Sequence, residues 1–126
     1  MTDGLQKKMQ QEVEKYKAIQ KEYQTVINSR QQLDSQLTEN NGVKDELGIL
    51  ESDANVFKLI GPVLIKQDLD EAKANVSKRI DYINGELKRL DKTIEDLDGK
   101  QDSQREVLSK LQQQLQQAQV KAAMKA

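Results

Sequence analysis

The chain has 126 residues and a formal net charge of −1, and 33% of its residues are charged whereas 3% are aromatic. This composition is too polar to fill a compact core and favours long helices or disorder, and the near-neutral charge gives no support for binding to nucleic acid or an anionic membrane. Because the sequence also lacks His, Cys and any phosphate-binding glycine motif, we predict neither an enzyme nor a cofactor.

The first predicted element is a helix over residues of about 3–50. Its apolar residues recur in steps of four and three, with two polar interruptions, which is the heptad spacing of a coiled coil; they are Leu5, Met9, Tyr16, Ile19, Tyr23, Val26, Leu33 and Leu37. From Leu37 to Val43 the interval is six residues instead of seven, so we expect a register slip with local overwinding around residues 40–42. The helix is predicted to continue because three apolar residues resume the series: Val43, Leu47 and Leu50.

A dense apolar run, NVFKLIGPVLIKQ, follows over residues of about 55–67. Its β-branched and aromatic residues favour strands. At its centre, Gly61 and Pro62 suit a two-residue type II′ hairpin turn, because Gly accepts a positive φ and Pro fixes a negative one. This turn pairs Ile60 with Val63 and gives the hairpin two largely apolar faces. One face holds Val56, Lys58, Ile60, Val63, Ile65 and Gln67, and the other holds Phe57, Leu59, Leu64 and Lys66.

A two-stranded hairpin with two apolar faces is marginal alone, and its edges also need cover. Since the sequence predicts no further strands, we interpret the hairpin as an assembly module that strands of other chains complete. The alternative is that the hairpin folds onto its own helices as a small cap. The predicted assembly residues are Val56, Phe57, Leu59, Ile60, Gly61, Pro62, Val63, Leu64 and Ile65.

A second helix is predicted over residues of about 68–122, beginning with the capping-box pair Asp68 and Glu71. Its heptad seam runs without a slip through Leu69, Lys73, Val76, Ile80, Ile83, Leu87, Leu90, Ile94, Leu97, Gln101, Gln104, Leu108, Leu111, Leu115, Ala118 and Ala122. Polar seam residues such as Gln101 and Gln104 usually set the register of a coil at some cost in stability. We expect the two helices to pack antiparallel, with the chain ends together and remote from the hairpin.

At the chain ends the seam residues become small or sparse, and apolar side chains become accessible to other chains. Methionine suits surfaces that accept varied partners. The predicted contact residues are Leu5, Met9 and Val13 near one end and Val120, Ala122, Ala123 and Met124 near the other. The alternative is that these ends are merely disordered.

Helix, single hairpin and helix in this order resemble a β-class subunit of the eukaryotic prefoldin family. The residues that carry the resemblance are the hairpin segment 57–67, the upstream QLTENN at 36–41 and the downstream RIDYI at 79–83. Gly42 and Gly48 depart from the family, which more often has good helix formers there. The resemblance covers nearly the whole chain, so we expect residues 1–126 to form a single prefoldin-like domain.

This resemblance implies a heterohexamer of α-class and β-class subunits, in which the hairpins form a double β-barrel and six coiled coils project from it. It also implies that the tips of the coils hold unfolded polypeptides, such as actin and tubulin, and pass them to the cytosolic group II chaperonin without ATP. The assembly residues are then the hairpin set, and the client-binding residues are the set at the chain ends.

A structural coiled-coil scaffold or tether is the alternative function, although a tether has no use for a central apolar hairpin. No apolar run approaches the roughly 20 residues that span a bilayer, and the first residues, MTDGLQKKMQ, lack the apolar core of a signal peptide. We therefore expect no membrane partner and a cytoplasmic location.

Overall fold

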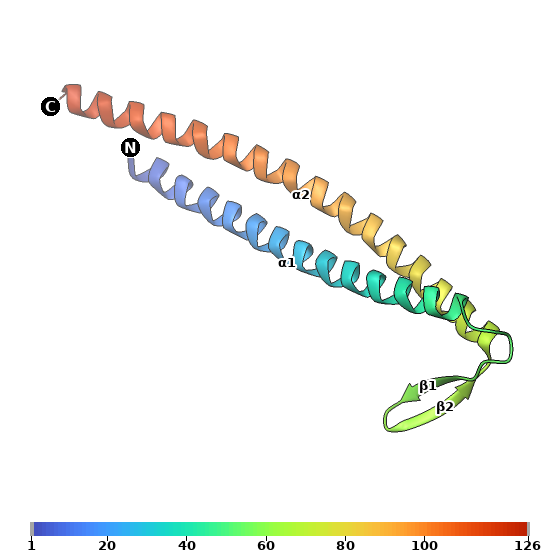
Figure 1. Cartoon of the computed structure of the whole chain (residues 1–126). Helices are drawn as coiled ribbons and strands as arrows, with labels where there is room; N and C mark the ends of the chain where they lie inside the picture. Colours follow the sequence, from blue (N-terminus) through green and yellow to red (C-terminus); the bar gives the residue numbers. More distant parts are fainter. Residues whose placement is uncertain (1, 126) are drawn as a thin grey trace. The chain divides into compact units, whose positions relative to one another are not determined.

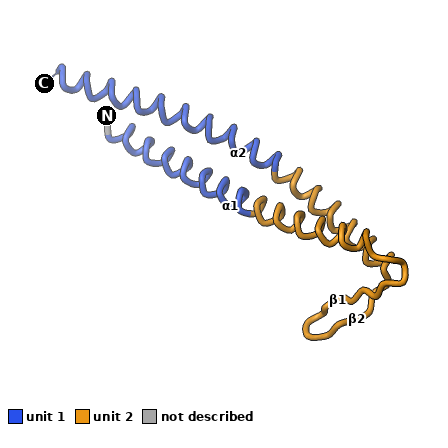
Figure 2. The backbone as a smooth tube through the Cα atoms, viewed as in Figure 1, with its two compact units in different colours: residues 1–28, 91–126 blue, residues 29–90 orange. Residues whose placement is uncertain are grey.

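The computed structural model describes residues 2–125 and holds two long helices with a β-hairpin between them (Figure 1). The elements are α1 (Thr2–Gly48), β1 (Val56–Ile60), β2 (Val63–Gln67) and α2 (Leu69–Lys125). The predicted arrangement of two helices joined by a single hairpin is confirmed. The chain forms two compact units (Figure 2): residues 29–90, which include the hairpin, and residues 1–28 with 91–126.

The predicted seam of α2 is buried or half-buried at every position from Leu69 to Ala118, and Ala122 alone is exposed. Within the hairpin unit the seam residues Ile80, Ile83 and Leu87 are buried against solvent. Burying a large aliphatic side chain contributes about 1.5–3 kcal/mol relative to leaving it exposed. The heptad spacing of the sequence therefore accounts for which face of α2 lies in the coil.

The predicted register slip in α1 is wrong. The helix continues unbroken through residues 40–42, and the heptad spacing runs from Leu37 through the half-buried Asn40 to the buried Leu47, whereas Val43 is 45% exposed. The Asn40 side chain donates a 2.7 Å hydrogen bond to the Gln36 carbonyl, so its amide is satisfied inside its own helix. A polar residue can therefore occupy the seam, and an exposed valine costs less than an interruption of the helical backbone.

Local hydrogen bonds close the end of α1 and the start of α2, on either side of the hairpin. After Gly48, the backbone N–H groups of Ile49 and Leu50 donate to carbonyls three residues earlier, at 3.3 and 3.4 Å, which is the tighter geometry that often closes a helix. At the start of α2, the Glu71 N–H donates to the Asp68 carboxylate at 3.2 Å. The predicted N-cap is thus present, and the helix begins where the capping pattern places it.

Candidate functional site

The hairpin has the predicted register and turn. Ile60 pairs with Val63 next to the turn, and Val56 pairs with Gln67 at the open end. Gly61 has a φ of +57°, and it is the only described residue with a positive φ. Pro62 therefore has a negative φ. This combination is that of a type II′ turn, whose twist matches the twist of the two strands.

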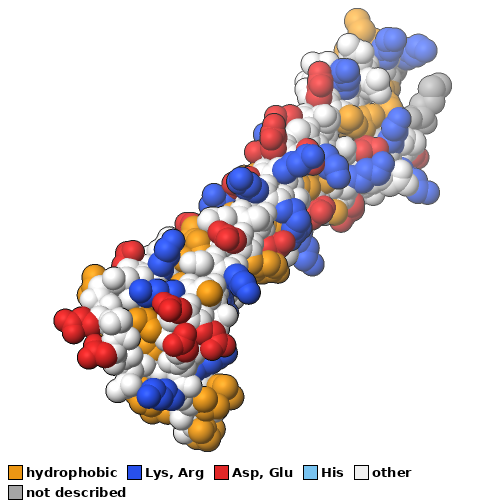
Figure 3. All heavy atoms as spheres, turned by 90° about the vertical axis from the view of Figure 1, so that its right-hand side faces the viewer, with side chains coloured by type: hydrophobic (Ala, Val, Ile, Leu, Met, Phe, Trp, Pro, Cys, Tyr) orange, Lys and Arg blue, Asp and Glu red, His pale blue; other side chains and the backbone are white. Residues whose placement is uncertain are grey.

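Both faces of the hairpin are open to solvent in this chain. Six of the predicted assembly side chains are between 47% and 67% exposed: Phe57, Leu59, Ile60, Val63, Leu64 and Ile65. Gly61 and Pro62 in the turn are exposed as well. The hydrophobic side chains of the hairpin gather at the bottom of the space-filling view (Figure 3). The hairpin therefore does not cap its own helices, and a patch of this kind normally marks a contact with another protein.

One residue of the hairpin is held by the helices of its own unit. Val56, at the start of β1, packs against a small core of Leu47, Leu69 and Ala72, together with Val76. This core joins the end of α1, the first turns of α2 and the base of the hairpin. It fixes the base of the hairpin on the helices while the rest of both strands projects into solvent.

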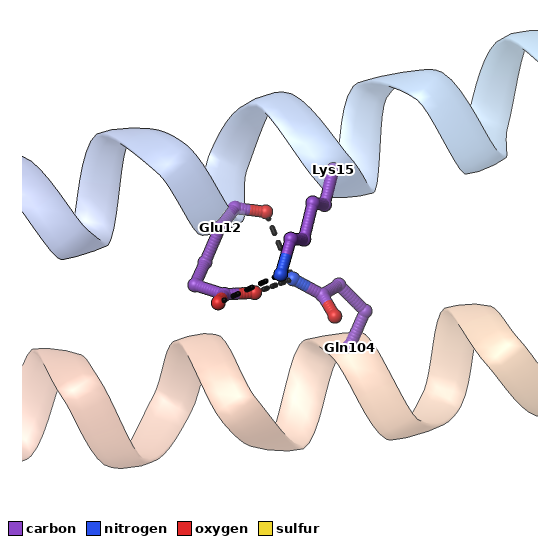
Figure 4. Close-up of polar contacts among 3 residues, drawn as sticks. All are labelled: Glu12, Lys15 and Gln104. Atoms are coloured by element: carbon purple, nitrogen blue, oxygen red, sulfur yellow. Dashed lines mark hydrogen bonds and ion pairs between the residues drawn. The ribbon is translucent and has the colours of Figure 1, made fainter.

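The seam of the other unit contains a polar contact between the helices (Figure 4). The Gln104 amide donates to the Glu12 carboxylate at 2.6 Å and to the Glu12 backbone carbonyl at 2.9 Å. Lys15 forms an ion pair with the same carboxylate at 3.4 Å, and the Glu12 side chain is 14% exposed. The hydrogen bond from Gln104 and, more weakly, Lys15 hold the pKa of the Glu12 carboxyl below its ordinary value.

A second polar contact joins Tyr16, one turn beyond Glu12 on α1, with Arg105, the residue after Gln104 on α2. Arg105 Nε donates to the Tyr16 hydroxyl at 2.8 Å, and the guanidinium carbon lies 5.8 Å from the centre of the Tyr16 ring. Arg105 also forms an exposed ion pair with Asp102 at 3.3 Å. The two contacts join α1 and α2 through polar groups as well as through apolar packing.

Gln101 is the exception in this seam, because its side chain is 8% exposed and its amide nitrogen has no hydrogen-bond partner among the described residues. A buried donor without a partner costs about 1–3 kcal/mol. The polar interruption predicted from the sequence thus has two parts: Gln104 is paired across the helices, and Gln101 is not.

The predicted client-contact residues differ in their surroundings. The seam residues Leu115 and Ala118 of α2 are still half-buried, whereas every residue from 119 to 125 is exposed. Residues 119–125 therefore form the end of α2, which extends past the start of α1 without a partner helix in the described chain (Figure 1). Val120, Ala122, Ala123 and Met124 lie there and are exposed, whereas Leu5, Met9 and Val13 are half-buried in the coil.

Residues 2–125 offer no group of three or more His, Cys, Asp or Glu side chains that could hold a metal ion. No helix in this described part is long and apolar enough to cross a membrane. Two parts of the described chain expose apolar side chains to solvent: the open hairpin and the unpaired end of α2.

Comparison with known proteins places these features in one family. The sequence profile of the prefoldin subunit family matches residues 10–122. Prefoldin subunit 6 of Mus musculus is 50% identical over 123 residues, which cover 98% of this chain and 97% of that protein. Prefoldin subunit 6 of Arabidopsis thaliana is 51% identical over 112 residues, covering 89% of this chain and 87% of that protein.

The fold has a counterpart among solved structures. The crystal structure of the prefoldin beta subunit from Thermococcus strain KS-1 matches with a TM-score of 0.69 and 27% identity, covering 88% of this chain and 91% of that chain. The resemblance to β-class subunits that the hairpin sequence indicated is confirmed. Sequence reasoning missed the pairing of Arg105 with Tyr16, since an arginine outside the seam gives no signal of its partner.

Proposed function

Given that this chain belongs to the prefoldin family and is a subunit of that co-chaperone complex, we propose that it captures unfolded polypeptides with the ends of its helices. We further propose that it passes them to the cytosolic group II chaperonin, without ATP. Unfolded actin and tubulin chains are the proposed clients, and the cytoplasm is the proposed location.

The observation that carries client capture is the unpaired end of α2, where Val120 and Met124 are 54% and 82% exposed. A flexible methionine next to small apolar residues adapts to many sequences. Half-buried Met9 and Val13 add apolar surface in a hollow on α1 of the same unit. A contact with so few apolar side chains is weak, so several subunits must bind the same client at once. Their combined affinity then exceeds that of any single contact.

The proposed role of the hairpin is assembly of the complex. Its two open apolar faces and unpaired strand edges suit strands from neighbouring prefoldin subunits, which would close it into the inter-subunit β-barrel. The scaffold or tether alternative requires helices that pair between chains. The contact of Gln104 with Glu12 shows a geometry in which the two helices of one chain can pair with each other, as a self-contained coil requires.

Client capture is tested with assembled complex and chemically denatured actin, with light scattering as the measure of aggregation. A complex in which this chain carries Val120→Ser and Met124→Ser should suppress aggregation less well, by about the share of one subunit. The matched control carries Gln116→Ser and Gln119→Ser, which change exposed polar residues on the same helix end and should have no effect.

A stronger form of the test removes the helix ends. Deleting residues 1–9 and 119–126 here, with the corresponding ends in all other subunits, should abolish protection of denatured actin. If the fully trimmed complex still assembles and protects actin as well as the intact complex, client binding at the helix ends is wrong.

A further inference from the structure

A groove lies beside the hairpin within the unit of residues 29–90. It encloses about 260 Å³ between the end of α1, the first turns of α2 and strand β1. Its apolar lining includes Val43, Phe57 and Val76, and its polar lining includes Asn40, Lys58 and Arg79. Since Phe57 and Lys58 belong to the exposed strand β1, the groove is continuous with the hairpin surface on which assembly is proposed to occur.

Val43 forms part of the apolar wall of the groove and does not pack in the coiled-coil seam. Val43 lies off the heptad seam and is 45% exposed. The seam position in this turn of α1 is occupied by Asn40 instead. Val43 and the exposed Phe57 both line the groove, and together they provide apolar surface for a small side chain of another chain. The interval of six residues from Leu37 to Val43, which suggested a register slip, thus places Val43 in the wall of the groove.

The charges in the groove are positive and lack partners. Arg89 and Arg105 are paired with carboxylates three residues earlier, and Arg30 also has an interaction. Among the described residues, Arg79 is the one arginine with no hydrogen bond or ion pair, and Lys58 likewise has none there. The exposed Glu39 lies near Arg79 in an adjoining hollow but forms no ion pair with it. A carboxylate from outside the chain would complete this site.

A second copy of this chain does not supply that carboxylate from its hairpin. Strands β1 and β2 carry Lys58 and Lys66 as their charged residues and contain no Asp or Glu. Bringing the hairpin of one copy into the groove of another would place lysine against lysine and arginine, and like charges in an interface oppose association. Strand-to-strand pairing with a second copy therefore leaves these cations without a carboxylate. Asp53 and Asp68 lie just outside the strands, and self-assembly is accordingly one of the outcomes measured below.

We infer that this groove receives an extended segment of a neighbouring prefoldin subunit that presents a small apolar side chain next to an Asp or Glu. The apolar side chain packs on Val43 and Phe57, and the carboxylate binds Arg79 and Lys58. This inference rests on the proposed assembly role of the hairpin and extends the interface from the strands onto both helices. It also disfavours direct pairing of two hairpins of this chain, because their strands carry no carboxylate.

The test uses the full-length chain co-expressed with α-class and β-class prefoldin subunits, and native mass spectrometry over a dilution series. Arg79→Glu reverses the charge in the groove and should raise the concentration at half-dissociation by about tenfold or more. Lys78→Glu is the matched control, because it makes the same charge change at the neighbouring exposed residue, which does not line the groove. Circular dichroism checks that both variants keep their helices.

Two further measurements separate the apolar and ionic parts. Val43→Ser should weaken the mixed complex several-fold, whereas Val107→Ser, at an exposed valine outside the groove, should not. The wild-type complex should weaken as salt rises from about 50 to 500 mM, and Arg79→Gln should reduce that salt dependence.

The outcomes distinguish the groove from the hairpin. If the Arg79 and Val43 variants assemble as tightly as their controls while the wild-type chain forms mixed complexes, the groove inference is wrong and the assembly role stands. Reduced protection of denatured actin by Arg79→Glu with unchanged assembly would assign the groove to clients and overturn the inference. Efficient assembly of the chain with itself also overturns it, and failure of the wild-type chain to join other subunits overturns both proposals.

Discussion

Gln101 lowers the free energy of unfolding of the coil. Its amide is buried and its nitrogen has no hydrogen-bond partner in residues 2–125, while Leu97 in the turn before it is buried in the ordinary way. We predict that Gln101→Leu stabilises the chain by about 1–2 kcal/mol, because a leucine fills the seam without an unsatisfied donor. Thermal unfolding followed by circular dichroism measures this. Lys100→Leu, at an exposed neighbouring position, is the control, and an equal gain there would contradict the explanation.

Glu12 makes the same coil sensitive to acid. Because Gln104 and Lys15 lower the pKa of the Glu12 carboxyl in the folded chain, its ionised form favours folding. The contribution is complete above the ordinary carboxyl pKa of 4.5 and is lost as the pH falls through the lowered value in the folded state. We therefore predict that Glu12→Gln is less stable than wild type at pH 6 and that the difference narrows toward pH 3.

Melting temperatures of both proteins across this pH range check the prediction. Glu14→Gln serves as the control, because Glu14 is exposed and makes only an exposed ion pair with Lys17. A difference between wild type and Glu12→Gln that stays constant from pH 6 to pH 3 would rule out the link to Glu12.

At the scale of the elements, the hairpin depends on one glycine. Gly61 has a φ of +57°, and a Cβ added there meets no atom within 4 Å, so any effect of Gly61→Ala is conformational. We predict that Gly61→Ala destabilises the hairpin by about 1 kcal/mol and raises the half-dissociation concentration of the mixed complex about fivefold. Native mass spectrometry over a dilution series measures the shift.

Gly85→Ala is the matched comparison, since Gly85 also has open space around its Cβ position but lies inside α2. Alanine is the better residue in a helix by about 1 kcal/mol, so this variant should raise the melting temperature. Two alanine substitutions without steric conflict should therefore change stability in opposite directions. The same sign for both would show that backbone conformation does not decide the outcome.

The elements differ in how far the sequence predicts them. The hairpin register and turn follow from residues 55–67 alone, because strand alternation and the Gly61–Pro62 loop are local. The α2 seam follows from its unbroken spacing. The α1 slip was a wrong prediction because it followed apolar residues, whereas the helix keeps its phase and places Asn40, not Val43, in the seam. The groove at Arg79 could not be predicted, since it requires the hairpin orientation that Val56 fixes against the helices.

At the scale of the whole molecule, stability is distributed unevenly, and this distribution suits the proposed function. The coil of the hairpin unit contains closely spaced buried seam residues, Ile80, Ile83, Leu87 and Leu90. The other unit has Gln101 and Gln104 in its seam, and residues 119–125 have no partner helix within the described chain. Local opening free energy is low where apolar contacts are few, so the helix end that is proposed to bind varied clients is also one that opens easily.

We therefore predict a gradient in hydrogen exchange along α2. Amides of residues 80–97 should exchange slowest, those of residues 104–111 faster, and those of residues 119–125 fastest, when the chain is followed by mass spectrometry near pH 7. Gln101→Leu should slow exchange in the middle segment and leave the last segment unchanged, because leucine restores the seam but supplies no partner to the end of α2. Uniform protection along α2 would mean that the polar seam residues do not weaken the coil, and that access for clients has another physical origin.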